Sequence, residues 1–441
     1  MLDFVLTNGE VALPGGPDRK DIGIRGGKIV SILPSGAKVE AKETLDCSGL
    51  TILPGVIDSQ VHFREPGLEH KEDLESGTRS AIMGGITTIF EMPNTNPATI
   101  TVEALEHKLK RARETAWTDH AFFVGGTPED VDWGMLESQK GCSGVKIFMG
   151  SSTGSLLVSE DEHIANILKQ TKRRVAVHCE DEERLKERKS IAVEGGKPEF
   201  HPVWRDEESA LRATKRLLKI AREQRAQVHV LHVTTRQEME LLADYKDVAT
   251  VEVTPQHLTL HAEQAYEELG TLAQMNPPIR SKEHQDGLWW GIEQGIVDVI
   301  GSDHAPHTLQ EKAKQYPNSP SGMPGVQTIL PLMLDHVKNG RLSLLRLVDL
   351  MCTGPARIFG IVNKGRIALG YDADFSIVDM NREMTLCDEM MESKCGWTPF
   401  DNKTISAFPV TTILRGQIVV KDCVLQTRPE VKPVEFQSTF R

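Results

Sequence analysis

The stretch IDSQVHFREPG, residues 57–67, determines how the rest of the chain is interpreted. It begins as an apolar β-strand and ends in polar side chains before a turn. Side chains along a strand alternate between its two faces, so Gln60, His62 and Arg64 are expected on one side. A strand that ends in this way delivers polar groups into a cleft, and an imidazole placed there is a candidate metal ligand.

Outward from this stretch, apolar strand-like segments alternate with amphipathic helix-like segments over roughly residues 52–360. The candidate strands are TILPGVIDSQVHF (51–63), TTIFEMPN (87–94), DHAFFVGG (119–126), GVKIFMG (144–150), VAVHCE (175–180), QVHVLHV (227–233), VATVEVTP (248–255) and VDVIGSDHAP (297–306). This alternation predicts parallel βα units, and eight of them predict an α/β fold of the (β/α)8 TIM-like barrel type. An open doubly wound sheet is the alternative, but it usually has fewer strands, and no glycine-rich phosphate-binding motif follows the first strand.

Both ends of the chain consist of short strand-like segments with turns. They are FVLTNGEVAL (4–13) and DIGIRGGKIVSIL (21–33) at one end, and GRIALGYDADFSIVD (365–379) and TTILRGQIVVKDCVL (411–425) at the other. We therefore expect a small β-sandwich domain built from residues 1–51 and 361–441, and a barrel domain over residues 52–360.

Composition excludes several classes of protein. Of 441 residues, 39% are hydrophobic and 26% charged, which is typical of a soluble globular protein. The net charge of −12 and the lack of a basic stripe argue against nucleic-acid binding. No apolar run approaches the ~18 residues of a membrane span, and no signal peptide is recognisable. Seven cysteines without a CxxC pair favour reduced thiols and a cytoplasmic protein.

In a TIM barrel the working residues lie at the carboxyl ends of the strands, and polar residues collect there in this sequence. They are His62, Arg64, Asn94, Lys146, His178, His232, Asp303 and His307. Three imidazoles and a carboxylate among them come from different strands, and a barrel would bring them together as a metal site. By strand alternation His229 is expected to face the helices. We expect His70, His107, His163, His201, His261, His284 and His336 to be solvated or to lie on helix surfaces.

Lys146 is unusual because it stands inside the apolar strand SGVKIFMG. Burying an ammonium group without a partner is costly. One explanation is a buried ion pair with a nearby carboxylate. The other is that the amine has reacted with carbon dioxide to form a carbamate, an anion that can bridge two metal ions.

These residues resemble the amidohydrolase superfamily, and within it the cyclic amidases: dihydroorotases, allantoinases and hydantoinases. The resemblance covers essentially the whole chain, including the tail motif CGWTPFDNKTI (395–405). Four motifs resemble dihydroorotases in particular: VHFREPG (61–67), EMPNTNP (91–97), MNPPIR (275–280) and GSDHAPH (301–307).

The resemblance implies a role for each metal-site residue. Lys146 corresponds to the carboxylated lysine that bridges two zinc ions. His178 and His232 correspond to ligands of the more exposed ion, and His62 and Asp303 to ligands of the more buried one. Asp303 also corresponds to the general acid/base.

The resemblance also implies a site for an anionic small-molecule substrate. The side chains that would hold its carboxylate are Arg64, Asn94, Asn276 and His307, and the backbone near Gly322 would contact the pyrimidine ring. Arg64 favours dihydroorotate over uncharged rings, because a planar guanidinium suits a carboxylate. The alternative is that Arg64 forms an ion pair with Glu65 or Glu69.

Gln60 departs from the dihydroorotase pattern, which has histidine at this position. A glutamine amide is a poorer zinc ligand than imidazole. We therefore expect one firm zinc site and a second that is weakened or empty. Alternatively, Gln60 hydrogen-bonds a neighbour and contacts no metal.

The implied activity is reversible cyclisation of N-carbamoyl-L-aspartate to dihydroorotate, as in pyrimidine biosynthesis. Two alternatives remain: a non-catalytic subunit that supports a transcarbamoylase partner, and another cyclic amidase such as an allantoinase or hydantoinase. The resemblance also implies a homo-oligomer, a dimer or larger. Residues 307–325 are expected to form a long loop at the active site or a plain surface insertion.

Overall fold

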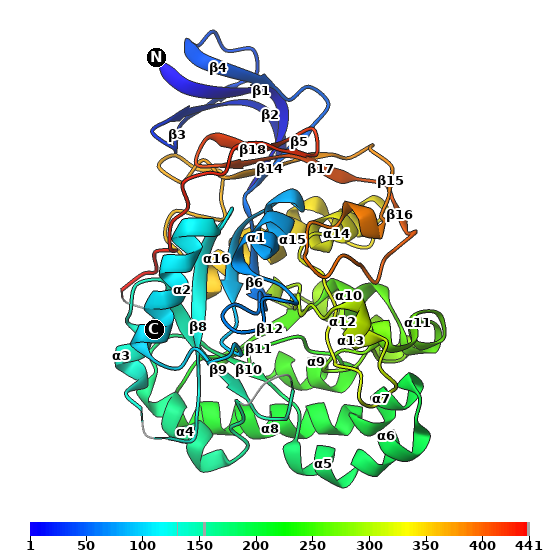
Figure 1. Ribbon diagram of the computed structural model, residues 1–441. Helices are drawn as coiled ribbons and strands as arrows, with labels where there is room; N and C mark the ends of the chain where they lie inside the picture. Colours follow the sequence, from blue (N-terminus) through cyan, green and yellow to red (C-terminus); the bar gives the residue numbers. More distant parts are fainter. Residues whose placement is uncertain (130, 153–155, 439–441) are drawn as a thin grey trace.

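The computed structural model describes residues 1–129, 131–152 and 156–438. Eight parallel strands form its central sheet, in the order in which they occur in the chain. They are β6 (Val56–Val61), β7 (Ile86–Glu91), β8 (Asp119–Gly125), β9 (Cys142–Phe148), β10 (Val175–His178), β11 (Val228–Val230), β12 (Ala249–Val253) and β13 (Val299–Ile300). A parallel bridge between Val61 and His304 joins the first strand to the segment after the last. The predicted (β/α)8 barrel is therefore confirmed (Figure 1).

Helices cover the outside of this barrel (Figure 1). They are α1 (Leu74–Met83), α2 (Val102–Thr115), α3 (Trp133–Glu137), α4 (Asp161–Gln170), α5 (Glu182–Glu187), α6 (Lys189–Gly195), α7 (His201–Trp204), α8 (Glu207–Gln224), α9 (Arg236–Ala243), α10 (Pro255–Thr259), α11 (Ala262–Leu269), α12 (Lys282–Glu293), α13 (Leu309–Lys312), α14 (Ile329–Lys338), α15 (Leu344–Val348) and α16 (Gly354–Ile358). Short 3-10 turns occupy Pro198–Phe200, Gly270–Ala273 and Asp388–Met390, and a π-helical turn occupies Asp349–Thr353.

Helix α8 illustrates why these segments fold as they do. Asp206 caps its first turn, with its side chain accepting a hydrogen bond from the Ser209 amide. Apolar residues recur at helical spacing along one face and are buried: Ala210, Ala213, Leu217, Leu218 and Ala221. This face packs in the apolar cluster that also contains β10 and β11, so burial of the helix and closure of the barrel stabilise each other.

A second sheet of nine strands is built from both ends of the chain. Its strands are β1 (Leu2–Leu13), β2 (Gly16–Arg25), β3 (Lys28–Pro34), β4 (Ala41–Asp46), β5 (Thr51–Pro54), β14 (Phe375–Asp379), β17 (Phe408–Leu414), β18 (Gln417–Lys421) and β19 (Val424–Leu425). Strand β5 pairs with β1 and β14, so the two termini meet in the middle of the sheet, as predicted. Strands β15 (Met384–Thr385) and β16 (Thr404–Ile405) form a separate ribbon.

The first candidate strand, residues 51–63, is in fact two strands in two different sheets. Residues 51–54 form β5 in the nine-stranded sheet, and residues 56–61 form β6 in the barrel. Gly55 separates them, and a side chain there would collide with Thr87 and Asp374. The apolar pattern runs through both strands, because both are buried on both faces.

Among the described helices, none combines the length and the hydrophobicity that crossing a bilayer requires. All seven cysteines have free thiols.

Candidate active site

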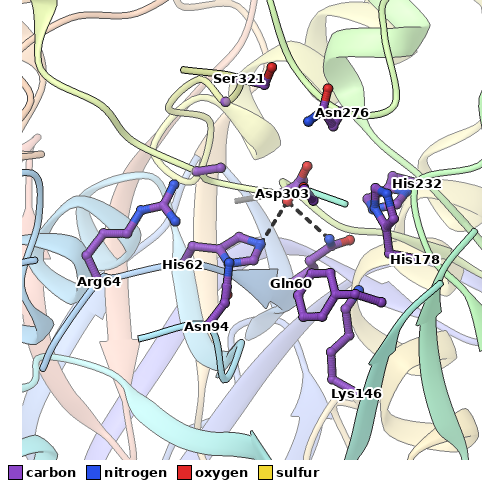
Figure 2. Close-up of a pocket in the computed structure, with 14 residues that line it drawn as sticks. Gln60, His62, Arg64, Asn94, Lys146, His178, His232, Asn276, Asp303 and Ser321 are labelled. Carbon is purple, nitrogen blue, oxygen red and sulfur yellow. Dashed lines mark hydrogen bonds and ion pairs between the residues drawn. The ribbon is translucent and has the colours of Figure 1, made fainter. Parts of the chain in front are cut away.

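The polar residues predicted at the strand ends surround one narrow cavity of about 20 Å³, except for His307, which lies behind its wall. Its lining contains Gln60, His62, Arg64, Asn94, Lys146, Phe148, Ser152, His178, His232, Asn276, Asp303, Ala305, Ser321 and Gly322. Figure 2 shows that His178 and His232 lie on one side of the cavity and Arg64 on the other, with Asp303 between them. Deeper in the barrel the interior is filled by an apolar cluster that includes Ala121, Phe123, Ala176, Leu231 and Phe359.

His178 and His232 face each other across 3.1 Å, between Nδ1 of the first ring and Nε2 of the second. His178 donates its Nε2 proton to Glu180 at 2.9 Å, which leaves the Nδ1 lone pair directed toward His232. Burial lowers the pKa of His178, and it lowers the pKa of His232 well below the usual value. Both rings are therefore neutral at physiological pH, the form in which imidazole binds a metal.

Glu180 holds His178 in this orientation, as carboxylates do for metal-binding imidazoles. Arg205 contacts Glu180 through Nε at 3.0 Å and Nη2 at 2.5 Å. Burial alone would raise the pKa of Glu180, but the charge of Arg205 and the hydrogen bond from His178 hold it well below its usual range. Sequence reasoning missed Glu180, although it lies two residues after His178, which is the spacing that shares a strand face.

Lys146 projects into the cavity from β9 and is completely buried. Its Nζ has no hydrogen-bond partner among the described residues. Burial lowers the pKa of the amine to about 7, against opposing attractions from Asp303 and Glu252. Neither a direct ion pair nor a hydrogen bond therefore explains this lysine. A neutral amine near pH 7 is a nucleophile that can react with carbon dioxide.

Asp303 is contacted by two side chains from β6 and its continuation (Figure 2). Gln60 donates from Nε2 to Asp303 Oδ1 at 3.1 Å, and His62 Nε2 lies 3.1 Å from the same oxygen. His62 Nδ1 lies 2.6 Å from Asn94 Oδ1. Neutral His62 has one ring proton, so it can donate to Asn94 or to Asp303 but not to both. Its other ring nitrogen keeps a lone pair that can bind a metal ion.

The backbone is strained at three of these positions. Arg64, His232 and Asp303 have φ of 65°, 36° and 45°, in the left-handed region that side chains other than glycine rarely adopt. Such strain persists only where the surrounding structure enforces it, and it concentrates at functional sites.

Arg64 forms the opposite wall of the cavity. It is 1% exposed, its Nε donates to the Pro306 carbonyl at 3.3 Å, and its Nη1 has no partner among the described residues. Burial lowers its pKa to about 10, so the guanidinium stays charged at neutral pH. Glu65 pairs with Arg111 at 2.6 Å instead, and Glu69 accepts from the Gly67 amide. The alternative of an ion pair with these two glutamates is therefore wrong.

The remaining predicted residues are Asn276, Gly322 and His307. Asn276 lines the cavity, and its Oδ1 lies 2.9 Å from His201 Nε2. Gly322 has φ of 137°, and a side chain there would collide with the Ala305 carbonyl and approach His307. His307 is buried behind this wall, with Nε2 3.5 Å from Arg64 Nη2. The structure thus brings every predicted site residue into or against one cavity.

Three histidines differ from expectation, and the first is His284, which is buried on helix α12. His201, expected to be solvated, is fully buried and supports Asn276. His229, expected to face the helices, lies inside the barrel, with Nδ1 2.8 Å from Thr250 Oγ1 and its ring against Phe359. The alternation rule failed for His229 because β11 ends at Val230, so His232 is no longer on the strand against which it was counted.

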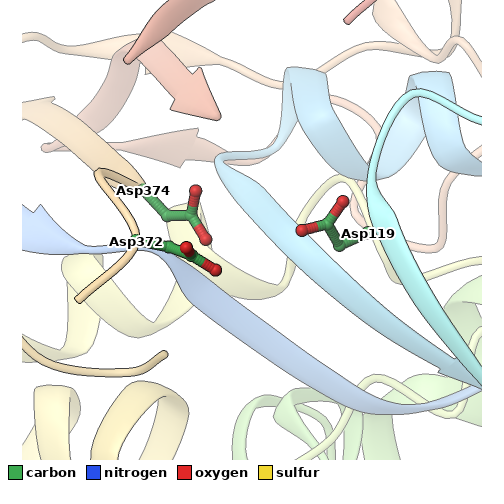
Figure 3. Close-up of side chains that lie close together, drawn as sticks. All are labelled: Asp119, Asp372 and Asp374. Atoms are coloured by element: carbon green, nitrogen blue, oxygen red, sulfur yellow. The ribbon is translucent and has the colours of Figure 1, made fainter. Parts of the chain in front are cut away.

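A separate group of carboxylates lies near the amino ends of the strands (Figure 3). Asp119, Asp372 and Asp374 have oxygens within 4.8 Å of one another, a spacing compatible with a cation. Lys364 already occupies this position, at 2.8, 3.1 and 2.6 Å from the three carboxylates. Arg415 also contacts Asp119. We therefore interpret this group as an ion-pair network.

The donor set of the cavity fits a metal better. Neutral imidazole nitrogens, the Asp303 carboxylate and the unpartnered Lys146 amine converge on it, and Lys146 Nζ and Gln60 Oε1 are buried polar atoms with no partner in the described part of the chain. Buried polar atoms are normally satisfied, and a bound metal ion would satisfy both of these.

Comparison with known proteins agrees with this arrangement. Residues 51–419 match the amidohydrolase family. Two of the similar proteins are a dihydroorotase from Halobacterium salinarum, 34% identical over 95% of each chain, and an L-hydantoinase from Paenarthrobacter aurescens, 33% identical over 96% of this chain and 95% of that one. Among solved structures, an L-hydantoinase from Arthrobacter aurescens superposes with a TM-score of 0.94 at 30% identity, covering 98% of this chain and 100% of that one. The chain belongs to the amidohydrolase family.

Proposed function

We propose that the protein is a dihydroorotase, a zinc hydrolase that interconverts dihydroorotate and N-carbamoyl-L-aspartate. The observation that carries this proposal is Arg64: a buried, charged guanidinium with an unpartnered Nη1 at the cavity wall. A buried cation needs an anion, and the substrate carboxylate of dihydroorotate supplies one. Asn94 and Asn276 also line this cavity, and His307 lies against Arg64.

His178, His232 and a carbamate on Lys146 would hold the firm zinc ion. His62 and Asp303 would offer a second, weaker site, because Gln60 stands where an imidazole is expected and already donates to Asp303. Zinc bound at such a site acts as a Lewis acid toward the ring amide and makes a water molecule acidic enough to react near neutral pH.

The residues of the chain complete the reaction. Arg64, with Asn94, Asn276 and His307, fixes the carboxylate and so orients the ring. Asp303 accepts a proton as water adds to the ring amide carbon, and it returns that proton to the ring nitrogen as the C–N bond breaks. The product is N-carbamoyl-L-aspartate, and the reverse sequence closes the ring.

The direct test is interconversion of the two compounds by the purified protein with zinc. Asp303→Asn keeps the shape of the side chain but cannot accept the proton, so we expect a loss of about 10²–10⁴-fold in kcat. Arg64→Met removes a charged hydrogen-bonding partner, so we expect kcat/KM for dihydroorotate to fall roughly 10–100-fold. Activity unaffected by Asp303→Asn would refute the assignment of the general base.

A second candidate, a hydantoinase, is favoured by the likeness to the solved L-hydantoinase. An activity panel of dihydroorotate, hydantoin, dihydrouracil and allantoin separates the two functions. Arg64→Met is the matched control, since it should impair only the carboxylated ring. A preference of the wild type for uncharged rings would make this second candidate the better one.

Metal content tests the proposed sites and the alternative of a non-catalytic subunit for a transcarbamoylase. We expect about one zinc ion per chain and a rise toward two in Gln60→His, with Gln60→Ala as the control that removes the amide without adding imidazole. A ¹³CO2-derived carbamate signal should be present in the wild type and absent in Lys146→Met. A protein that binds no zinc would support the subunit instead.

We also propose that the protein works in the cytoplasm as a homo-oligomer. The free thiols support the first point, and similarity to enzymes of this family motivates the second. Light scattering of the purified protein measures the oligomeric state.

A further inference from the structure

His307 lies between two cationic side chains, Arg64 and Lys71. The proposed mechanism gives a role to Arg64 but none to Lys71. Its Nδ1 lies 3.1 Å from Nζ of Lys71, and its Nε2 lies 3.1 Å from the Ser321 carbonyl and 3.5 Å from Nη2 of Arg64. The ring is fully buried, and its own carbonyl accepts from Trp397 Nε1 at 2.8 Å. His307 therefore cannot turn freely, and its neighbours determine its protonation.

Burial and the charges of Arg64 and Lys71 lower the pKa of His307 well below its usual value, so the ring is neutral and carries one proton. The Lys71 ammonium has only donors; burial lowers its pKa, while the Glu311 carboxylate, 3.1 Å from Nζ, favours the charged form. Nδ1 must then accept from Lys71. The single proton is left on Nε2, where it is donated to the Ser321 carbonyl.

This choice of tautomer matters for Arg64. With a proton on Nε2, His307 and Arg64 Nη2 face each other as two donors, so no hydrogen bond forms across the 3.5 Å between them. Arg64 then keeps its donors for a ligand. With the proton on Nδ1 instead, Nε2 would accept from Arg64 and draw the guanidinium away from the cavity. Glu311 Oε2, 3.8 Å from Nδ1, would be a ready acceptor for that other tautomer.

We propose that Lys71 is a positioning residue: it fixes His307 as the Nε2–H tautomer and thereby keeps Arg64 available to the substrate carboxylate. The part that concerns the carboxylate rests on the proposed function, whereas the tautomer of His307 does not. Lys71 lies in the loop between β6 and α1 and does not itself line the cavity, which is why sequence reasoning passed over it.

The first test measures the tautomer in protein without substrate. Nitrogen-15 NMR of histidine-labelled protein distinguishes Nδ1–H from Nε2–H, and His307→Asn assigns the signal. We expect Nε2–H in the wild type and in Lys71→Arg, which retains a cationic donor. In Lys71→Met we expect Nδ1–H to predominate. An Nδ1–H signal in the wild type, or an unchanged tautomer in Lys71→Met, would overturn the proposal.

The second test measures its consequence with two rings, dihydroorotate and dihydrouracil, which lacks the carboxylate. In Lys71→Met we expect KM for dihydroorotate to rise roughly tenfold, with kcat within about threefold, and Lys71→Arg to restore most of the affinity. Dihydrouracil turnover should not change. Lys282→Met is the matched control, because Lys282 also pairs with a carboxylate but has an exposed side chain at the start of helix α12.

These outcomes separate the possible failures. Suppose that Lys71→Met lowers kcat and raises KM for both rings and also lowers the melting temperature. Lys71 would then have a merely structural role, and the positioning role would be refuted. If the wild type does not process dihydroorotate at all, the proposed function fails, while the NMR result still decides whether Lys71 sets the tautomer. If Lys71→Met does not fold, the wild-type spectrum still tests the proposal, because an Nδ1–H signal there would overturn it.

Discussion

Two buried lysines, Lys146 and Lys364, have opposite surroundings. They are 1% and 7% exposed, so desolvation opposes the charge on both. Lys364 lies within 3.1 Å of three carboxylates, whose charges outweigh burial and raise its pKa. Lys146 has no hydrogen-bond partner among the described residues, and its pKa falls to about 7. The same side chain is thus a fixed cation in one place and a reactive amine in the other.

The two lysines differ because they lie at opposite ends of the barrel. Asp119 opens strand β8 at the amino end, and Asp374 leads into β14 of the nine-stranded sheet, so Lys364 joins the two sheets by charge (Figure 3). Lys146 points toward the carboxyl end, among the histidines. Paired charges hold the fold together, whereas unpaired polar atoms mark the place where a ligand is expected.

The largest expected effect is on activity, in Lys146→Met. Loss of a metal-bridging carbamate should reduce kcat/KM by about 10³-fold or more. The stability of the metal-free protein should stay equal or rise, because an unpaired buried amine is replaced by an apolar side chain of similar size. Steady-state kinetics and thermal unfolding measure the two effects. Retained activity would mean that Lys146 has a structural role like that of Lys364, and the proposed difference between the two lysines would be wrong.

The second expected effect is on stability, in Lys364→Met. Removing this cation leaves three carboxylates close together in a buried site, so we expect a loss of about 3–5 kcal/mol in the free energy of unfolding. The activity of the folded fraction should remain within about twofold, since the change is at the other end of the barrel. Denaturant unfolding checks this, with the exposed Lys282→Met expected to stay within about 0.5 kcal/mol. A small loss would mean that the network contributes little.

The surroundings of Lys146, at the carboxyl end of the barrel, could be predicted well from the sequence. The barrel follows from eight apolar segments, and the polar residues that end them meet at one edge because parallel strands share a direction. A lysine inside an apolar strand is visible in the sequence without any structure. Gln60 is visible too, although only the structure reveals that it donates to Asp303.

The ion-pair network around Lys364 could not be predicted, because the partners of this lysine are distant in sequence or lie in turns. Asp119 is 245 residues from Lys364 along the chain, and nothing in the pattern pairs them. His201 was misjudged for a related reason: its short helix exposes Val203, but the His201 ring turns inward against Tyr316 and Asn276, which no periodicity reveals. Local patterns predict elements and strand ends, while long-range packing between loops must be observed.

The smallest expected effect concerns pH and separates the two lysines in a single experiment. In metal-free protein under CO2-free buffer, Lys146 has a pKa of about 7 when folded, below the usual lysine value of about 10.4 in the unfolded chain. Between these values the unfolded state binds more protons, so the free energy of unfolding rises with pH. Below pH 7 the cost of the buried ammonium is present in full.

Lys364 behaves in the opposite way. Its pKa is raised in the folded state, so its stabilisation is complete below the unfolded pKa and is lost only as the pH rises through the folded value. From pH 7 to 9 the difference between wild type and Lys364→Met should therefore stay constant. Over the same range the difference between wild type and Lys146→Met should shift in favour of the wild type by up to roughly 2–3 kcal/mol. Parallel curves for both pairs would show that Lys146 stays charged over this range, and that the attraction of Asp303 and Glu252 outweighs its burial.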